Sequence, residues 1–81
     1  MRKYRYDVTI CPDNSPQAFK TTCAKIEKAF PYLVKEKLLV DVDGSTIQVY
    51  SKNGKEVVIY DDYDEGAVFA LADYDIRNAL K

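Results

Sequence analysis

Apolar and polar residues alternate through the middle of the chain, between Lys37 and Asp62. The alternation is interrupted twice, at Asp43-Gly44 and at Asn53-Gly54. A two-residue hairpin loop needs positive φ angles at its centre, which Gly adopts without steric cost and which Asn and Asp tolerate. The pattern therefore predicts a three-stranded antiparallel meander.

The two loops also predict which side chains share a face of this meander. With Asn53-Gly54 as the second loop, Val49 faces Val58 and Ile47 faces Tyr60. The first loop can be Asp43-Gly44 or Gly44-Ser45, and both give the same faces because the side-chain period of a strand is two. One face should hold Leu38, Val40, Val42, Ile47, Val49, Val58 and Tyr60, and the other Leu39, Gln48, Tyr50, Val57 and Ile59. The second face is too apolar to lie in water, so a helix or a partner should cover it.

A strand and a helix are predicted before the meander. Residues Lys3 to Ile10 alternate and indicate a half-buried strand at one edge of the sheet. Ser15 is a good helix N-cap, and Pro16 suits the first helical position because it has no N–H to satisfy. The helix should run to about Phe30 and stop before Pro31. Its apolar stripe consists of Phe19, Cys23, Ile26 and Phe30.

The tail, residues 67–81, fits two structures. As a helix it places Phe69, Ala72, Ile76, Ala79 and Leu80 on one stripe; as a strand it pairs back on residues 56–62. The helix is favoured, because acidic residues precede it and basic residues end it, the favourable sense for the helix dipole. The predicted fold is then α+β in the order β-α-β-β-β-α, with the N-terminal strand beside the meander, helices packed on the sheet, and a single domain spanning residues 1–81.

The residue types argue against catalysis. The chain has no His, which removes the commonest general base and zinc ligand. Its two cysteines, Cys11 and Cys23, lack metal-binding spacing and are expected to be reduced thiols. No phosphate-binding or nucleophile motif occurs, so we expect no enzyme, no cofactor and no metal. With no apolar segment long enough for a membrane span or a signal peptide, a cytoplasmic protein without membrane contact is expected.

Charge is divided unevenly along the chain. Residues 1–38 carry eight basic and four acidic side chains, a net +4, whereas residues 39–81 carry four basic and nine acidic ones, a net −5. The acidic residues are interleaved with Tyr, a residue enriched in protein interfaces. We therefore predict a small interaction module, such as an inhibitor or a DNA mimic, that docks on a basic partner protein. Its contact residues would be Asp61, Asp62, Tyr63, Asp64, Glu65, Asp73, Tyr74 and Asp75.

Two alternatives stay open. The first is a nucleic-acid-binding domain, although a sequence pI near 5.3 makes it the less favoured one. Its phosphate contacts would come from Arg2, Lys3, Arg5, Lys20, Lys25 and Lys28. The second is a homodimer that buries one sheet face, made of Leu39, Tyr50, Val57 and Ile59.

Overall fold

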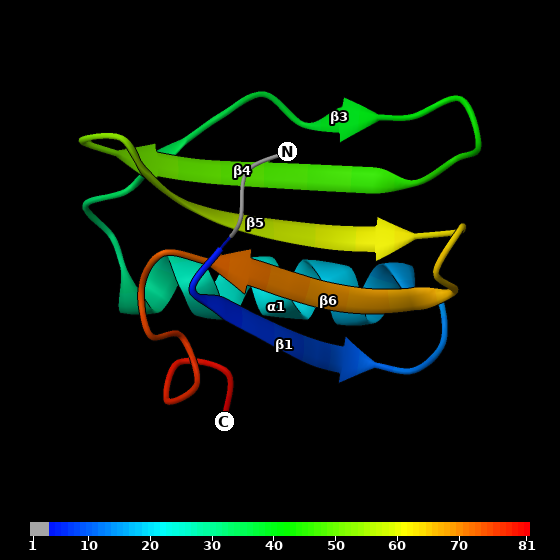
Figure 1. Ribbon diagram of the computed structural model, residues 1–81, viewed down its shortest axis with the longest axis horizontal. Coiled ribbons are helices and arrows are strands. Elements are labelled where there is room, and N and C mark those ends of the chain that lie inside the picture. Colours follow the sequence, from blue (N-terminus) through cyan, green and yellow to red (C-terminus); the bar gives the residue numbers. More distant parts are fainter. Residues whose placement is uncertain (1–3) are drawn as a thin grey trace.

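The computed structural model describes residues 4–81 and shows an α+β fold, one helix on a six-stranded antiparallel sheet (Figure 1). The strands follow the spatial order β1-β6-β5-β4-β2, and β3 pairs with β4 beside β2. The elements are β1 (Tyr6–Cys11), α1 (Pro16–Ala29), β2 (Val34–Lys35), β3 (Leu39–Val40), β4 (Thr46–Lys52), β5 (Lys55–Asp62) and β6 (Ala67–Ala72).

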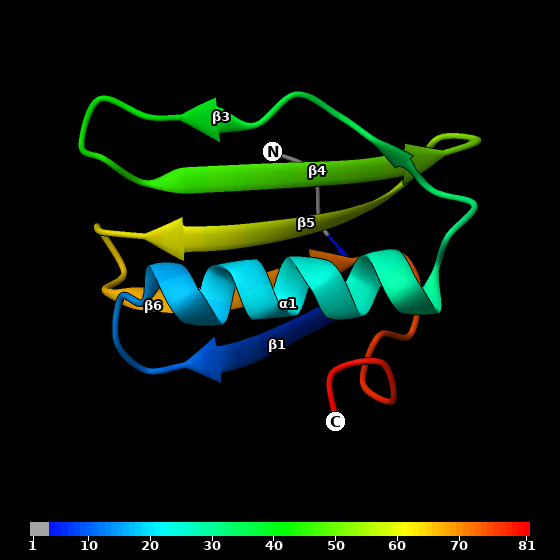
Figure 2. The ribbon, with the colours of Figure 1, turned by 180° about the vertical axis from the view of Figure 1, so that it is seen from behind.

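The helix α1 forms as its sequence predicts. The hydroxyl of Ser15 accepts a hydrogen bond from the backbone N–H of Ala18 at 3.1 Å, which caps the helix start. Pro16 occupies the first turn, and the helix ends before Pro31, with Phe30 as its C-cap. Its buried side chains are Phe19, Thr22, Cys23 and Ile26. Figure 2 shows α1 lying across one face of the sheet, in front of β6 and between β5 and β1.

The hairpin of β4 and β5 has the predicted register. Asn53 and Gly54 both adopt positive φ angles, 54° and 81°, and Val49 pairs with Val58. The face that carries Tyr50, Val57 and Ile59 packs under α1, and these three side chains are at most 1% exposed. A helix of the same chain therefore covers the apolar face, which is not available for the homodimer predicted to bury it.

The predicted register of the first hairpin is wrong. Val40 pairs with Thr46, which leaves a five-residue loop at 41–45, and Leu39 pairs with Ile47. Leu39 thus lies on the face opposite Tyr50 instead of beside it. The loop is longer because aspartate side chains bind its backbone: Asp41 accepts from the N–H of Val42 at 2.7 Å, and Asp43 from that of Ser45 at 2.9 Å.

The favoured C-terminal helix is also wrong. Residues Ala67–Ala72 form β6, which pairs with β5 as in the strand alternative and inserts between β5 and β1. The N-terminal strand therefore lies beside β6 and does not extend the meander directly. As a strand, the segment buries Val68, Ala70 and Ala72 under α1. On the opposite face of the sheet the ring of Phe69 stacks on that of Tyr60, with the ring centroids 4.8 Å apart. A helix here would leave the edge of β5 unpaired.

Candidate functional site

Three loops that are distant in sequence meet at one end of the sheet (Figure 1). They connect β1 to α1, β3 to β4, and β5 to β6. The amide of Asn14 donates to Oδ1 of Asp61 and to the backbone oxygen of Asp62, both at 2.9 Å, and the hydroxyl of Ser45 accepts from the N–H of Tyr63 at 2.9 Å. These contacts clamp the loops together. The exposed carboxylates that the loops present, here called the acidic end, belong to Asp13, Asp41, Asp43, Asp64 and Glu65.

The predicted acidic patch is divided by the fold. Asp61, Asp62, Tyr63, Asp64 and Glu65 lie at the acidic end, but Asp73, Tyr74 and Asp75 follow β6 at the other end of the sheet. Several of these carboxylates also have partners in the same chain. Asp73 accepts from the N–H of Glu56 at 2.8 Å, and Asp75 forms a 2.8 Å ion pair with Arg77 that lowers the pKa of Asp75 to about 2. The patch is therefore not one continuous surface.

The sequence also gave no signal that Asp13, Asp41 and Asp43 would join the acidic end. Each lies in a turn, where a solvated carboxylate is the ordinary expectation. Only the strand order brings their loops beside the β5–β6 turn. Asp43 is held in the ionised form, because the backbone N–H of Ser45 donates to it and lowers its pKa.

A groove of about 380 Å³ runs from the acidic end between α1 and the strands β3 and β4. In Figure 2 α1 lies in front of β6, between β5 and β1, so the helix does not extend over β4, whose residues form the other side of the groove. Asp61 and Tyr63 line it at the acidic end, and Glu27 and Lys35 line it at the other. Between them it is walled by Pro16, Phe19, Lys20, Cys23, Ala24, Leu38, Thr46 and Gln48.

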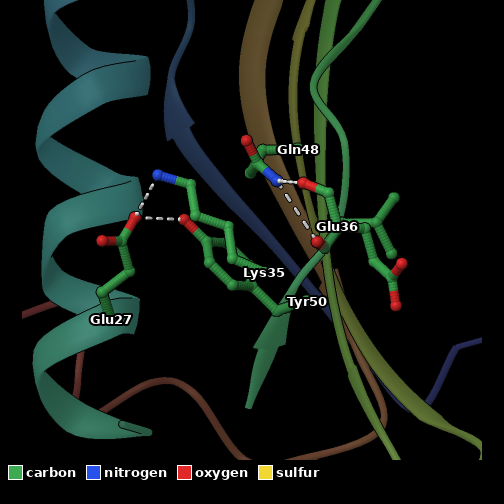
Figure 3. Close-up of polar contacts among 6 residues, drawn as sticks. Glu27, Lys35, Glu36, Gln48 and Tyr50 are labelled. Atoms are coloured by element: carbon green, nitrogen blue, oxygen red, sulfur yellow. Dashed lines mark hydrogen bonds and ion pairs between the residues drawn. The ribbon is translucent and has the colours of Figure 1, made fainter.

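Polar contacts fix the far end of the groove (Figure 3). The hydroxyl of Tyr50 donates to Oε2 of Glu27 at 2.6 Å, and Nζ of Lys35 lies 3.1 Å from the same oxygen. The Tyr50 hydrogen bond, followed by that of Lys35, lowers the pKa of Glu27. Burial, with the same hydrogen bond, raises the pKa of Tyr50. The helix and the sheet are thus joined by a charged carboxylate and a neutral phenol.

Gln48 supports the edge of the groove. Lys35 pairs with Tyr50 and Leu39 with Ile47, so the edge segment has one more residue than β4 between these pairs, as in a β-bulge. The Gln48 amide, 4% exposed, donates to the backbone oxygen of Glu36 at 2.6 Å (Figure 3). A buried side chain therefore satisfies a carbonyl of this irregular segment.

Asp61 is the one buried carboxylate of the described residues, at 4% exposure. Within residues 4–81 its side chain receives one hydrogen bond, from Asn14 to Oδ1. A carboxylate has about four acceptor positions, so Asp61 retains capacity to bind a donor in the groove. Cys23 also lines the groove and has a side chain that can be reactive. Burial raises the pKa of its thiol, however, and disfavours the nucleophilic thiolate.

Three further properties of the described residues are metal binding, membrane spans and the state of the cysteines. No three His, Cys, Asp or Glu side chains of the described residues form a group that could hold a metal ion. Across residues 4–81, no helix has both the length and the apolar character needed to cross a membrane. Both cysteines are free thiols.

Two of the basic residues proposed for nucleic acid, Lys20 and Lys25, lie on opposite flanks of α1. Arg2 and Lys3 lie outside the described residues. Lys20 lines the groove, whereas Nζ of Lys25 donates to the backbone oxygen of Leu80 at 3.4 Å. The C-terminal segment lies beyond β1, on the other side of α1 from β3 and β4 (Figure 2). The helix thus directs these two lysines to opposite flanks.

A scan against protein-family models finds no match to this chain, and searches of the curated proteins and of the solved structures find none either. What the site does is therefore inferred from its own residues and contacts.

Proposed function

We propose that this chain is a non-enzymatic interaction module that binds a basic segment of a partner protein at the acidic end and along the adjoining groove. The observation that carries the proposal is the position of Tyr63, which is 49% exposed and lines the groove where exposed carboxylates from three loops surround it. Tyr provides a rigid contact area with a polar tip, and the carboxylates attract cationic side chains.

The groove supports a specific type of contact. Phe19 and Leu38 give it apolar walls, and Asp61 adds a carboxylate of low exposure. Sites that combine an apolar cleft with few polar groups bind an anchoring side chain and fix its orientation. The best occupant is a residue with an apolar stem and a cationic head, Lys or Arg, flanked by further basic residues. The loops need little rearrangement to receive it, since Asn14 and Ser45 already clamp them.

The roles of inhibitor and DNA mimic are narrower forms of this proposal. Both require a basic groove on the partner that would otherwise hold nucleic acid. The carboxylates are gathered at one end of the molecule, so the partner surface would be compact.

Capture from a lysate of the source cells, followed by identification of the retained proteins, tests the proposal. The test variant combines Asp13→Asn, Asp64→Asn and Glu65→Gln. These changes neutralise exposed carboxylates whose oxygens accept no hydrogen bond from the loops. The matched control combines Asp7→Asn, Asp73→Asn and Asp75→Asn, which makes the same charge change away from the acidic end. A basic protein retained by the wild type and the control, and lost by the test variant, is the expected result. Equal retention by both variants would refute the docking site.

A second variant tests the groove separately. Ala24 is an exposed residue of α1 that lines the groove, so Ala24→Trp should fill it without disturbing the core. We expect at least about a tenfold loss of affinity for the captured partner if an anchor side chain enters the groove. Unchanged affinity would restrict the contact to the acidic end.

A further inference from the structure

The exposed apolar side chains of this protein are concentrated on one edge of the sheet. Of the seven large hydrophobic residues that are exposed within residues 4–81, six lie between positions 32 and 42; Tyr63 is the seventh. They belong to β2, β3 and their flanks, and no strand of the described chain pairs with their outer side. The six are Tyr32, Val34, Leu38, Leu39, Val40 and Val42.

The opposite edge of the sheet is different. β1 carries a register shift between Thr9 and Cys11, and its exposed positions, Asp7 and Thr9, are polar. Bulges and charged side chains are the usual means by which an edge strand avoids pairing with another chain. Around β3 the exposed side chains are Leu39, 49% exposed, and Val40, 68% exposed. This edge is therefore suited to strand addition, whereas β1 is not.

The backbone of β3 shows which groups face outward. The N–H of Asp41 donates to the backbone oxygen of Ser45 at 2.8 Å, so the backbone N–H of Asp41 points toward β4. In an antiparallel strand neighbouring residues alternate in direction, and the N–H and C=O of Val40, which precedes Asp41 in β3, therefore point away from the sheet. These groups can form a hydrogen-bonded pair with another strand.

The sequence of this edge is complementary to itself. It reads Lys37-Leu38-Leu39-Val40-Asp41, with a basic residue at one end, an acidic residue at the other and three apolar residues between. In an antiparallel pair centred on Leu39, Leu38 faces Val40 of the second copy and Lys37 faces its Asp41. The same contacts recur on the other side of the twofold axis. This register also places the backbone of Leu38 opposite the outward backbone groups of Val40.

We propose that the edge formed by β2 and β3 binds the same edge of a second copy of this chain, in this antiparallel register, and forms a symmetric dimer with one continuous sheet. The ammonium group of Lys37 is free to make the cross-strand ion pair, since this side chain forms no hydrogen bond or ion pair with another residue of positions 4–81. Lys35 is not, because it is paired with Glu27. The interface is short, so the dimer is a weak one that depends on concentration. The interface shares Asp41 with the acidic end and Leu38 with the groove. The dimer is nevertheless tested separately, because it is measured on the pure chain without a basic partner.

Sedimentation equilibrium of the full chain tests the dimer, over a range from about 10 µM to about 1 mM that suits a small interface. We expect the wild type to shift from monomer to dimer mass across this range. Lys37→Asp places like charges opposite each other twice in each dimer, and Asp41→Lys does the same with the opposite sign. Each should raise the dissociation constant by about tenfold or more. Lys81→Asp, a charge reversal away from the edge, should leave it unchanged.

Mixing the two variants provides the decisive measurement. A dimer of one Lys37→Asp chain and one Asp41→Lys chain has complementary charges at both pairs, so an equimolar mixture should associate where each variant alone does not. The double variant with both reversals should also recover the dimer. Circular dichroism of each variant confirms that it is folded. A wild type that stays monomeric to about 1 mM, reversals without effect, or a mixture that does not recover association would each overturn the proposal.

Discussion

Tyr63 packs its ring against Gly44, so that a Cβ added to Gly44 would lie 3.1 Å from Cε2 of Tyr63. The two residues belong to the β5–β6 turn and to the β3–β4 loop, and the backbone N–H of Tyr63 is bonded to Ser45 beside Gly44. Gly44 also has a φ of 91°, which side chains disfavour. This glycine therefore sets both the shape of its loop and the position of the exposed tyrosine in the proposed binding site.

Replacing Gly44 with Ala should destabilise the fold more than the same change at Gly66. Both have positive φ, and each replacement should cost about 1 kcal/mol of unfolding free energy for that reason. An added Cβ meets no atom within 4 Å at Gly66, whereas at Gly44 it meets the ring of Tyr63. Urea unfolding of both variants measures the difference. Equal losses would show that the ring moves aside without cost.

Asn14→Ala should destabilise the protein by about 1–3 kcal/mol, the cost of leaving a buried polar group without its partner. The amide supplies the one hydrogen bond that the described residues make to the side chain of Asp61, and it also binds the backbone oxygen of Asp62. Chemical denaturation measures the loss. The neighbouring change Asp13→Ala, at an exposed side chain, should stay within about 0.5 kcal/mol. A small effect at Asn14 would mean that water replaces its amide.

Tyr50→Phe should lower the unfolding free energy by about 1 kcal/mol, because it removes the hydrogen bond to Glu27 and keeps the packing of the ring. The pKa of Glu27 should rise in this variant, since that hydrogen bond is the largest cause of its depression. NMR titration of the side-chain carboxyl and thermal unfolding give the two readouts. Tyr74→Phe is the control, because its hydroxyl reaches a backbone oxygen only at 3.5 Å. A similar loss in both variants would contradict the link between helix and sheet.

Acid should weaken the contact between Glu27 and its partners. The pKa of Glu27 is below its ordinary value of 4.5 in the folded protein, so the ionised form is favoured by folding. Its contribution to stability is present above that ordinary value and is lost as pH falls through the lower, folded pKa. The stability difference between the wild type and Glu27→Gln should therefore shrink from pH 6 toward about pH 3. Unfolding measured along this pH series tests it, and a constant difference would show that the charge is not involved.

Local sequence determined the parts of the fold whose signals act over a few residues. The cap at Ser15, the stop at Pro31 and the Asn53-Gly54 turn each fix nearby backbone angles, and the apolar stripe of α1 and the alternation of β4 and β5 then define which faces are buried. These elements agree with the structure in type and, for β4 and β5, in register.

Tertiary structure decided the remainder. Residues 67–72 satisfy both a helical and a strand pattern, and the free edges of β5 and β1 selected the strand because pairing satisfies the backbone of all three segments. The longer β3–β4 loop depended on hydrogen bonds that the carboxylates of Asp41 and Asp43 accept from backbone N–H groups, and these outweighed the shorter turn. The acidic end and the groove depended on the order of the strands and on how much of the sheet one helix can cover. Sequence thus determined the local elements of this protein, whereas only the three-dimensional pairing of distant segments decided where its surfaces lie, because spacing along a chain does not fix which strands become neighbours.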